Sequence, residues 1–361
     1  MPHAAEEATS RDRTQPVADL PGAIPRGRRW LLFALFFSIC CGLGYPSLNR
    51  VDWRQAPGGL DDVLTYRALV TSPPAPDLDQ HMQFRVLVPY LARPIYRMAK
   101  GRIGTWDPIM FGLLVVDSFF TAFTALLLVT VVCGQLGSYT VGLGAALLFL
   151  LNFAVPNLRL AGFVDAGEAF FLMLLVWALF ERRYWMLPIA GILGATAKES
   201  FVPFLMVFTL AWWLSSRRSL RHPLPAALWI ATSWFAALAA LTSLQWKITH
   251  VFRSPLRFGL EMHGNTAYLA HFLSSFRDRN FWYIFFWLLP LGLFRLNRLP
   301  RNWRIATAAT CVTAFALDAY YGGAPGTIGR ALFSIAGPLL SASVALLLFT
   351  RPPATPTAPT M

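Results

Sequence analysis

The feature that most constrains this chain is a set of long, uninterrupted apolar runs. Runs at 30–48, 109–133 and 224–244 approach or exceed the roughly 20 residues that a helix needs to cross a hydrocarbon core of about 30 Å. Charged residues make up 14% of the chain, whereas soluble domains carry about 25%. The sequence therefore predicts an all-α integral membrane protein and excludes a soluble core.

Apolar runs and the residues between them predict about ten transmembrane helices. Basic residues decide the count, because Lys and Arg concentrate in short cytoplasmic loops. All five basic clusters fall on one side if ten helices cross, and both termini are then cytoplasmic. The clusters are Arg26/Arg28/Arg29, Arg182/Arg183, Arg217/Arg218/Arg221, Arg295/Arg298/Arg301/Arg304 and Arg351. The predicted spans lie near 30–48, 109–133, 138–154, 166–180, 185–197, 201–215, 224–244, 281–294, 303–319 and 331–349.

The segment 185–215 is predicted to be a hairpin of two short helices. A single helix over this segment would put the arginines at 182–183 and 217–218 on opposite sides of the membrane, against the charge rule. Two helices that meet at Lys198, Glu199 and Ser200 keep them together. Because a helix of about 13 residues reaches only about 20 Å, we expect the turn to lie below the outer surface, in protein or a wet cavity.

The chain is predicted to form one polytopic membrane domain at 29–350. A polar cytoplasmic tail at 1–28 precedes it and a second cytoplasmic tail follows at 351–361. Two outer segments are long, at 49–108 and 245–280, and loops of such length are often functional. The first is rich in Pro and Gly and becomes amphipathic at 84–93, which predicts a helix in the membrane interface.

Charged residues at membrane depth are candidates for function, because each costs about 2.5 kcal/mol or more. Asp165 and Glu168 share a helix face, which suits acid–base chemistry or metal binding, and equally the stabilisation of acids at a helix N-terminus. For the isolated Asp117, a salt bridge to a neighbouring helix and a catalytic role stay open. The remaining candidates, nearly all on the predicted outer side, are Lys198, Glu199, Asp318 and Arg330.

A cofactor is not expected, with one exception in the first outer loop. Asp77 and Asp79 are separated by one residue and can chelate a divalent cation through oxygen ligands, although solvated charge is the commoner state of such a pair in a Pro-rich loop.

The formal net charge of +13 does not predict a nucleic-acid partner, since the basic residues lie at the ends of apolar runs and form no long stripe. A phosphate-cradling glycine loop, a nucleophile elbow and a His-Glu-x-x-His motif are absent from the sequence. Soluble nucleotide chemistry is therefore unsupported, and the lipid bilayer is the expected surrounding.

Five short segments on the predicted outer side form an ordered set. They are Asp62 with Tyr66 four residues later, Phe84-Arg85-Val86-Leu87-Val88-Pro89, Gly162-Phe163-Val164-Asp165, Gly194-Ala195-Thr196-Ala197-Lys198-Glu199-Ser200 with Pro203, and Gly329-Arg330-Ala331-Leu332 with Pro338. In this order they resemble bacterial members of the GT-C class of membrane glycosyltransferases. In that class an early outer loop carries an acidic residue followed by a tyrosine, often as Asp-x-x-x-Tyr-x-x-Ala. The resemblance is one of pattern and covers most of the membrane body.

The resemblance implies a GT-C-like fold in a bacterial inner membrane. It also implies transfer of a sugar from a polyprenyl-phosphate donor to a glycan, lipid or protein acceptor on the non-cytoplasmic face. The attacking hydroxyl needs a carboxylate base and the leaving phosphate needs fixed positive charge. Asp62 is the expected base, and Asp61 stays open as the alternative. The residues expected to bind the substrate or its phosphate are Arg85, Lys198, Glu199, Asp165 and Arg330.

Two other classes of function stay open. Asp117, Lys198 and Glu199 are suited to line the path of a transporter or lipid flippase for an anionic substrate, although the charges are biased to one face and the sequence has no internal repeat. A non-catalytic scaffold of an envelope-assembly complex is the third alternative.

Overall fold

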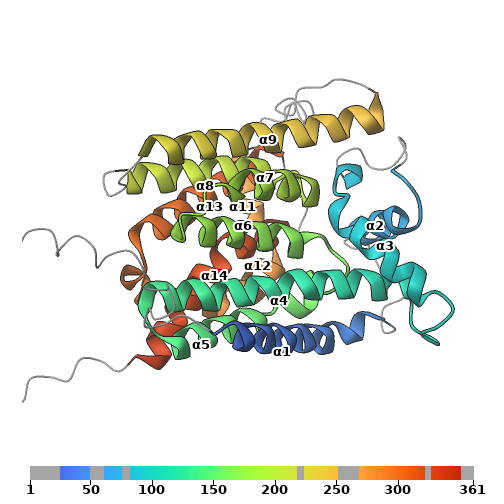
Figure 1. Cartoon of the computed structure of the whole chain (residues 1–361), viewed down its shortest axis with the longest axis horizontal. Coiled ribbons are helices and arrows are strands. Elements are labelled where there is room, and N and C mark those ends of the chain that lie inside the picture. The colour runs from blue at the N-terminus through green and yellow to red at the C-terminus, as the bar shows by residue number, and fades with distance from the viewer. Residues whose placement is uncertain are drawn as a thin grey trace, which may run out of the picture.

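The fold is all-helical in the residues that the structure, a computed structural model, describes: 25–48, 61–74, 82–217, 223–250, 268–321 and 327–350. The long helices α1, α4 and α9 run along the longest dimension of the molecule (Figure 1). The short helices α2 and α3 lie together at the end opposite to the C-terminus of α14 (Figure 1). The α-helices are α1 (Arg26–Gly44), α2 (Asp61–Thr71), α3 (Leu87–Ala99), α4 (Pro108–Leu136), α5 (Tyr139–Leu150), α6 (Asp165–Phe180), α7 (Met186–Ala197), α8 (Phe201–Ser216), α9 (Pro223–Thr249), α11 (Tyr268–Ser275), α12 (Arg279–Phe294), α13 (Arg301–Tyr321) and α14 (Thr327–Phe349).

Four helical segments of the described chain are long and apolar enough to cross a membrane: Gly27–Leu48, Pro108–Leu136, Pro223–Thr249 and Ile328–Phe349. Each contains one of the predicted spans or most of it. The other predicted spans also lie on helices, but α5, α7 and α8 have only 12, 12 and 16 residues. At about 1.5 Å per residue these reach about 18 to 24 Å, which is less than the hydrocarbon thickness.

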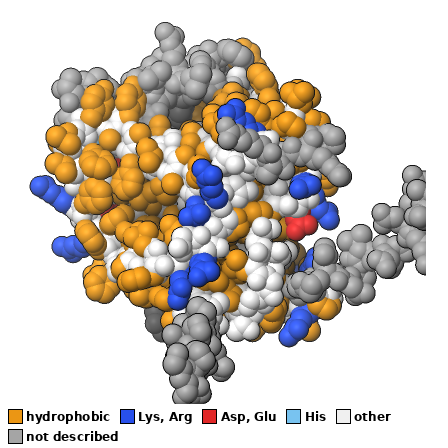
Figure 2. Space-filling view, turned by 90° about the vertical axis from the view of Figure 1, so that its left-hand side faces the viewer, with side chains coloured by type: hydrophobic (Ala, Val, Ile, Leu, Met, Phe, Trp, Pro, Cys, Tyr) orange, Lys and Arg blue, Asp and Glu red, His pale blue; other side chains and the backbone are white. Residues whose placement is uncertain are grey.

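The surface of the bundle is apolar to an extent that water would not tolerate. Phe286 of α12, Leu224 and Phe235 of α9, and Leu31 of α1 are each more than 70% exposed. Soluble monomers rarely expose large contiguous apolar patches, so such side chains are expected to face lipid. At the end of the molecule that lies on the left in Figure 1, the visible charged side chains are mostly Lys and Arg (Figure 2).

Local sequence sets the ends of α4 and α5. The Asp107 side chain accepts hydrogen bonds from the backbone N–H groups of Ile109 and Met110, and Pro108 occupies the first helical position, where no N–H is needed. At the other end, Gly137 takes a left-handed conformation (φ 67°), and the Ser138 hydroxyl accepts from Val141 N–H to begin α5. A tight turn therefore joins the two helices.

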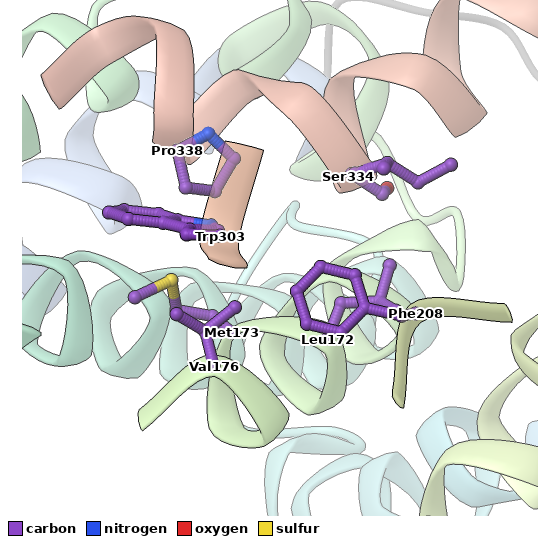
Figure 3. A pocket seen from close by; sticks show the side chains of 8 residues that line it. Leu172, Met173, Val176, Phe208, Trp303, Ser334 and Pro338 are labelled. Atoms are coloured by element: carbon purple, nitrogen blue, oxygen red, sulfur yellow. The ribbon is translucent and has the colours of Figure 1, made fainter. Parts of the chain in front are cut away.

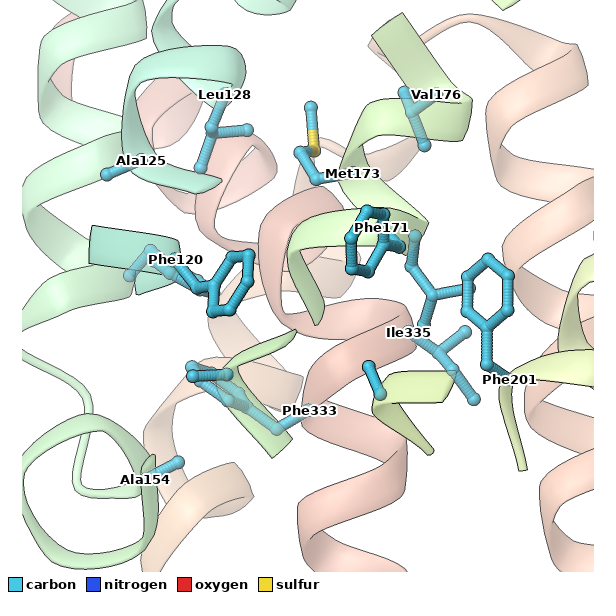
Figure 4. Packing of buried hydrophobic residues seen from close by; sticks show 14 of the residues in the cluster. Phe120, Ala125, Leu128, Ala154, Phe171, Met173, Val176, Phe201, Phe333 and Ile335 are labelled. Carbon is cyan, nitrogen blue, oxygen red and sulfur yellow. The ribbon is translucent and has the colours of Figure 1, made fainter. Parts of the chain in front are cut away.

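Aromatic side chains fill the centre of the bundle, where α4, α6, α8 and α14 meet (Figure 4). Phe120 of α4 lies 5.9 Å from Phe171 of α6, and Phe171 lies 6.3 Å from Phe201 of α8, measured between ring centroids. All three side chains are almost fully buried. This packing fixes the N-terminal half of α6 against the turn that begins α8.

The break between α7 and α8 falls where the charge rule predicts it. Lys198 has an extended backbone (φ −160°, ψ 133°), and α8 begins at Phe201. A Cβ atom on Gly194 would lie 2.3 Å from the Phe201 ring, so only glycine permits the two helices to approach this closely.

The structure differs from the expectation from sequence in two places. The apolar run 138–154 is not one helix, because α5 ends at Leu150 and a short π-helical segment, Val155–Arg159, follows. The helix α2 was not predicted, since its residues are partly polar and the preceding segment is rich in Pro and Gly. This short helix carries Asp62 and Tyr66.

Candidate functional site

Arg85 joins α2 to the turn between α7 and α8. Its Nε donates to Glu199 Oε2 at 2.8 Å, its Nη2 donates to Glu199 Oε1, and its Nη1 donates to the Tyr66 hydroxyl at 2.6 Å. Arg85 and Tyr66 are buried. Bidentate pairing of this kind is strong and directional. The Nε, Nη1 and Nη2 groups of Arg85 therefore each donate a hydrogen bond within the protein.

Burial shapes the protonation of this group. It raises the pKa of Tyr66 to about 12, and the neighbouring Arg85 charge only partly opposes the effect. For Arg85, burial alone would lower the pKa, but the Glu199 charge outweighs it and holds the pKa well above its usual range. At neutral pH this group is thus a neutral phenol beside a charged pair.

Lys198 forms a second pairing with the start of α6. Its Nζ lies 2.5 Å from Asp165 Oδ1 and 3.3 Å from Glu168 Oε2. The Ser200 hydroxyl donates to the other Glu168 oxygen at 2.5 Å. Asp165 and Glu168 are buried on one helix face, as their spacing predicts, so the α7–α8 turn is fastened to α6 by charge.

Arg330 of α14 contacts the carboxylates of Asp62 and Asp165, which lie far apart in the sequence. Its Nη1 is 3.4 Å from Asp165 Oδ2, and its Nη2 is 3.4 Å from Asp62 Oδ2. The guanidinium carbon lies 4.6 Å from the centroid of the Phe163 ring, which supports its face. These are long contacts for charged groups, which normally approach to about 2.7–2.9 Å.

These contacts bring together six of the seven residues predicted for the site. We call Asp62, Arg85, Asp165, Glu168, Lys198, Glu199 and Arg330 the charged cluster; it joins α2, the start of α3, the start of α6, the α7–α8 turn and α14. The seventh predicted residue, Asp61, is the first residue of α2, and its side chain lies outside the described residues. Glu168 belongs to the charged cluster but is not one of the seven predicted site residues.

Asp117 is fully buried in α4 and has no salt bridge within the described part of the chain. Neither of its carboxylate oxygens has a hydrogen-bond partner among those residues. The salt bridge to a neighbouring helix that the sequence left open is therefore not formed there.

Arg159 is the charged residue near the cluster that sequence reasoning missed. It ends the π-helical segment after α5 and is 1% exposed. The available signal was a lone arginine within the apolar stretch that precedes Asp165, since Arg at membrane depth is costly. It shares a small cavity with Asp165 and Arg330.

The predicted cation site at Asp77 and Asp79 lies outside the described residues. Within the described ranges, His, Cys, Asp and Glu residues form no group of three that could hold a metal ion.

A narrow apolar pocket lies between α6, α8, α13 and α14. Met173, Phe208, Trp303 and Pro338 line it, and their side chains point toward one another (Figure 3). None of the described residues that line it is ionisable, so acid–base chemistry belongs to the charged cluster and not to this pocket.

Comparison with known proteins adds no family to these observations. No protein-family model matches the chain, and no curated protein matches it. The geometry of the charged cluster is therefore the basis for a functional assignment.

Proposed function

We propose that this protein is a membrane glycosyltransferase of the GT-C type. In this proposal ten helices cross a bacterial inner membrane, both termini are cytoplasmic, α3 lies in the outer interface, and a polyprenyl-phosphate sugar is the donor. The acceptor is a glycan, a lipid or a protein. The observation that supports it is the Asp62–Arg330–Asp165–Lys198 chain of contacts, because it joins four of the segments that resemble the class.

In the proposed reaction, Asp62 takes the proton from the acceptor hydroxyl as its oxygen attacks the anomeric carbon. The bond between that carbon and the donor phosphate oxygen breaks, and the polyprenyl phosphate leaves with the bonding electron pair. A single displacement of this kind inverts the anomeric carbon. Asp62 suits the role of base because its side chain is partly exposed, whereas Asp165 and Glu168 are closed off by Lys198 and Ser200.

Arg330 is the proposed partner of the leaving phosphate. Its two 3.4 Å contacts are weak for a guanidinium, so a phosphate can replace the Asp62 contact without the loss of a strong pair. Lys198 supplies a second positive charge. Arg85 is assigned a positioning role here: its contacts with Glu199 and Tyr66 hold α2, and so Asp62, beside the α7–α8 turn.

The test is sugar transfer by membranes that contain the full chain, with a panel of radiolabelled polyprenyl-phosphate sugars. With a donor that the wild type uses, Asp62→Asn is expected to lower the rate by at least about 100-fold, the usual contribution of a general base. The control is Glu181→Gln at the end of α6, an exposed acid outside the cluster, which should keep the wild-type rate. Full transfer by Asp62→Asn would overturn the assignment of the base.

The transporter alternative makes a different prediction in proteoliposomes. Flipping of a polyprenyl-phosphate lipid by the wild type, abolished in Lys198→Ala, together with no transfer from any donor in the panel, would replace the glycosyltransferase assignment. Sugar transfer without flipping supports it.

A further inference from the structure

Asp117 of α4 is a buried acid that no described cation balances. It lies about 14 Å along the helix from Pro108, the first residue of α4, and is 0% exposed. Among the described residues, neither of its carboxylate oxygens has a hydrogen-bond partner and no ion pair includes it. The Thr121 hydroxyl, one turn later on the same helix face, makes no hydrogen bond with it. An ionised Asp117 would therefore lack the partners that a buried charge requires.

The negative charge of Asp165 opposes ionisation of Asp117 further. Helix α4 packs against α6, and the Asp165 carboxylate at the start of α6 acts electrostatically on Asp117. Asp165 itself has two cations beside it, since Lys198 Nζ stands at 2.5 Å and Arg330 Nη1 at 3.4 Å. Two neighbouring buried carboxylates ionise together only where cations balance both of them. Asp165 has such cations, and within the described chain Asp117 does not.

The charges around the charged cluster already balance without Asp117. Arg159 is included in this count because it lies beside Asp165 and Arg330. The described residues then comprise four cations, Arg85, Arg159, Lys198 and Arg330, and four anions, Asp62, Asp165, Glu168 and Glu199. An ionised Asp117 would add a fifth anion to these four without a fifth cation.

A carboxyl group, unlike a guanidinium, can avoid this cost by binding a proton, and a proton needs no cavity. We propose that Asp117 is a proton-binding site of the native protein, so that its side chain is a neutral carboxylic acid at neutral pH. The bound proton keeps a second negative charge away from Asp165 and so leaves Lys198 and Arg330 to the charged cluster. This inference does not depend on the proposed function, since it follows from the surroundings of Asp117 alone.

Infrared spectroscopy of the full chain tests the proposal, at neutral pH and in a detergent that has no ester carbonyl groups. The C=O stretching band of a protonated carboxylic acid lies at higher frequency than the amide and carboxylate bands. The wild type is expected to show such a band, and Asp117→Asn is expected to lose it. The matched control is Glu181→Gln, which changes an exposed acid at the end of α6 and should keep the band.

The melting temperature of Asp117→Asn gives a second measure. If Asp117 is neutral, the substitution exchanges one uncharged group for another of the same shape, and the melting temperature should stay within about 4 °C of the wild type. A folded Asp117→Asn variant that melts about 10 °C or more below the wild type would overturn the proposal, because a fall of that size is expected when a buried ion pair loses one partner.

Asp117→Glu tests the assignment of the band even if the Asn variant gives no folded protein. It keeps a carboxylic acid at this position, so the band should shift in frequency and not disappear. A wild type without the band would overturn the proposal. So would a band that stays unchanged in Asp117→Asn or in Asp117→Glu, since it would then belong to another acid.

Discussion

The Asp62–Arg330 pair and the Asp165–Lys198 pair belong to one charged cluster, but they differ in geometry. Asp62 is 21% exposed in its side chain and stands 3.4 Å from Arg330, whereas Asp165 is 4% exposed and stands 2.5 Å from Lys198. A short, buried pair is costly to break, because the remaining charge stays buried without a partner. A long, partly exposed pair exchanges partners more easily. We call Asp165–Lys198 the deep pair and Asp62–Arg330 the outer pair. We therefore assign support of the fold mainly to the deep pair, whose Lys198 also adds positive charge near the leaving phosphate, and assign proton transfer and phosphate contact to the outer pair.

The largest expected effect concerns the deep pair. Lys198→Met removes the cation from two buried carboxylates and is expected to lower the free energy of unfolding by about 3–5 kcal/mol. Thermal unfolding in detergent measures it. The control is Lys247→Met, because Lys247 is exposed in the last turn of α9. If both variants melt alike, the Asp165–Lys198 pair does not support the fold.

Arg330→Gln tests the outer pair. Because both Arg330 contacts are long and Asp165 keeps its Lys198 partner, this substitution should lower the free energy of unfolding by less than Lys198→Met, by about 1–2 kcal/mol. Sugar transfer, by contrast, should fall by about 100-fold, equivalent to about 2.7 kcal/mol in the barrier. A variant that melts several degrees lower and transfers normally would reverse the assignment of this residue.

The Arg85–Glu199 pair is a third ion pair of the charged cluster. Its close, bidentate geometry resembles the deep pair, whereas its Glu199 side chain is 20% exposed, much like Asp62 of the outer pair. A double-mutant cycle with Arg85→Gln and Glu199→Gln should give a coupling energy of about 2 kcal/mol, read from thermal unfolding. Additive effects of the two substitutions would show that Arg85 does not fasten α2 to the α7–α8 turn.

Tyr66→Phe is the smallest change, with an expected decrease in stability of about 1 kcal/mol for one hydrogen bond to Arg85. Because burial raises the Tyr66 pKa to about 12, above its value of about 10 in the unfolded chain, the stabilisation is fully present below about pH 10. It is lost as the pH rises through about 12. The difference between wild type and Tyr66→Phe should therefore be constant from pH 7 to 9 and decrease above pH 10. A decrease already between pH 7 and 9 would contradict the buried phenol.

The sequence predicted the helical framework because apolar runs and arginine clusters are local signals. The break at Lys198 followed from charge alone, without knowledge of the packing of Gly194 against Phe201. The end of α5 at Leu150 was not predicted, although Asn152 interrupts the apolar run and its Oδ1 accepts from the Ala154 N–H just before the π-helical segment. Helix α2 was missed because short, partly polar helices are stabilised by tertiary packing more than by propensity.

The members of the site were more predictable than their partners. Asp165, Lys198 and Arg330 could be selected because charge is costly beside lipid. Their pairing could not, because Arg330 reaches Asp62 across 268 positions of sequence and no periodicity encodes such a contact. Arg159 was overlooked, and its place beside the stacked rings of Phe149 and Phe333 depends on three segments that only the fold brings together.

In our proposal the outer pair, Asp62 and Arg330, carries the chemistry and contributes little to the fold. The most direct test is the double variant Asp62→Asn/Arg330→Gln, which removes both charges and keeps side chains of similar size, with melting temperature and sugar transfer measured on the same preparation. We expect a melting temperature within about 4 °C of the wild type and a loss of transfer of at least about 100-fold. Transfer at the wild-type rate by a folded double variant would contradict it.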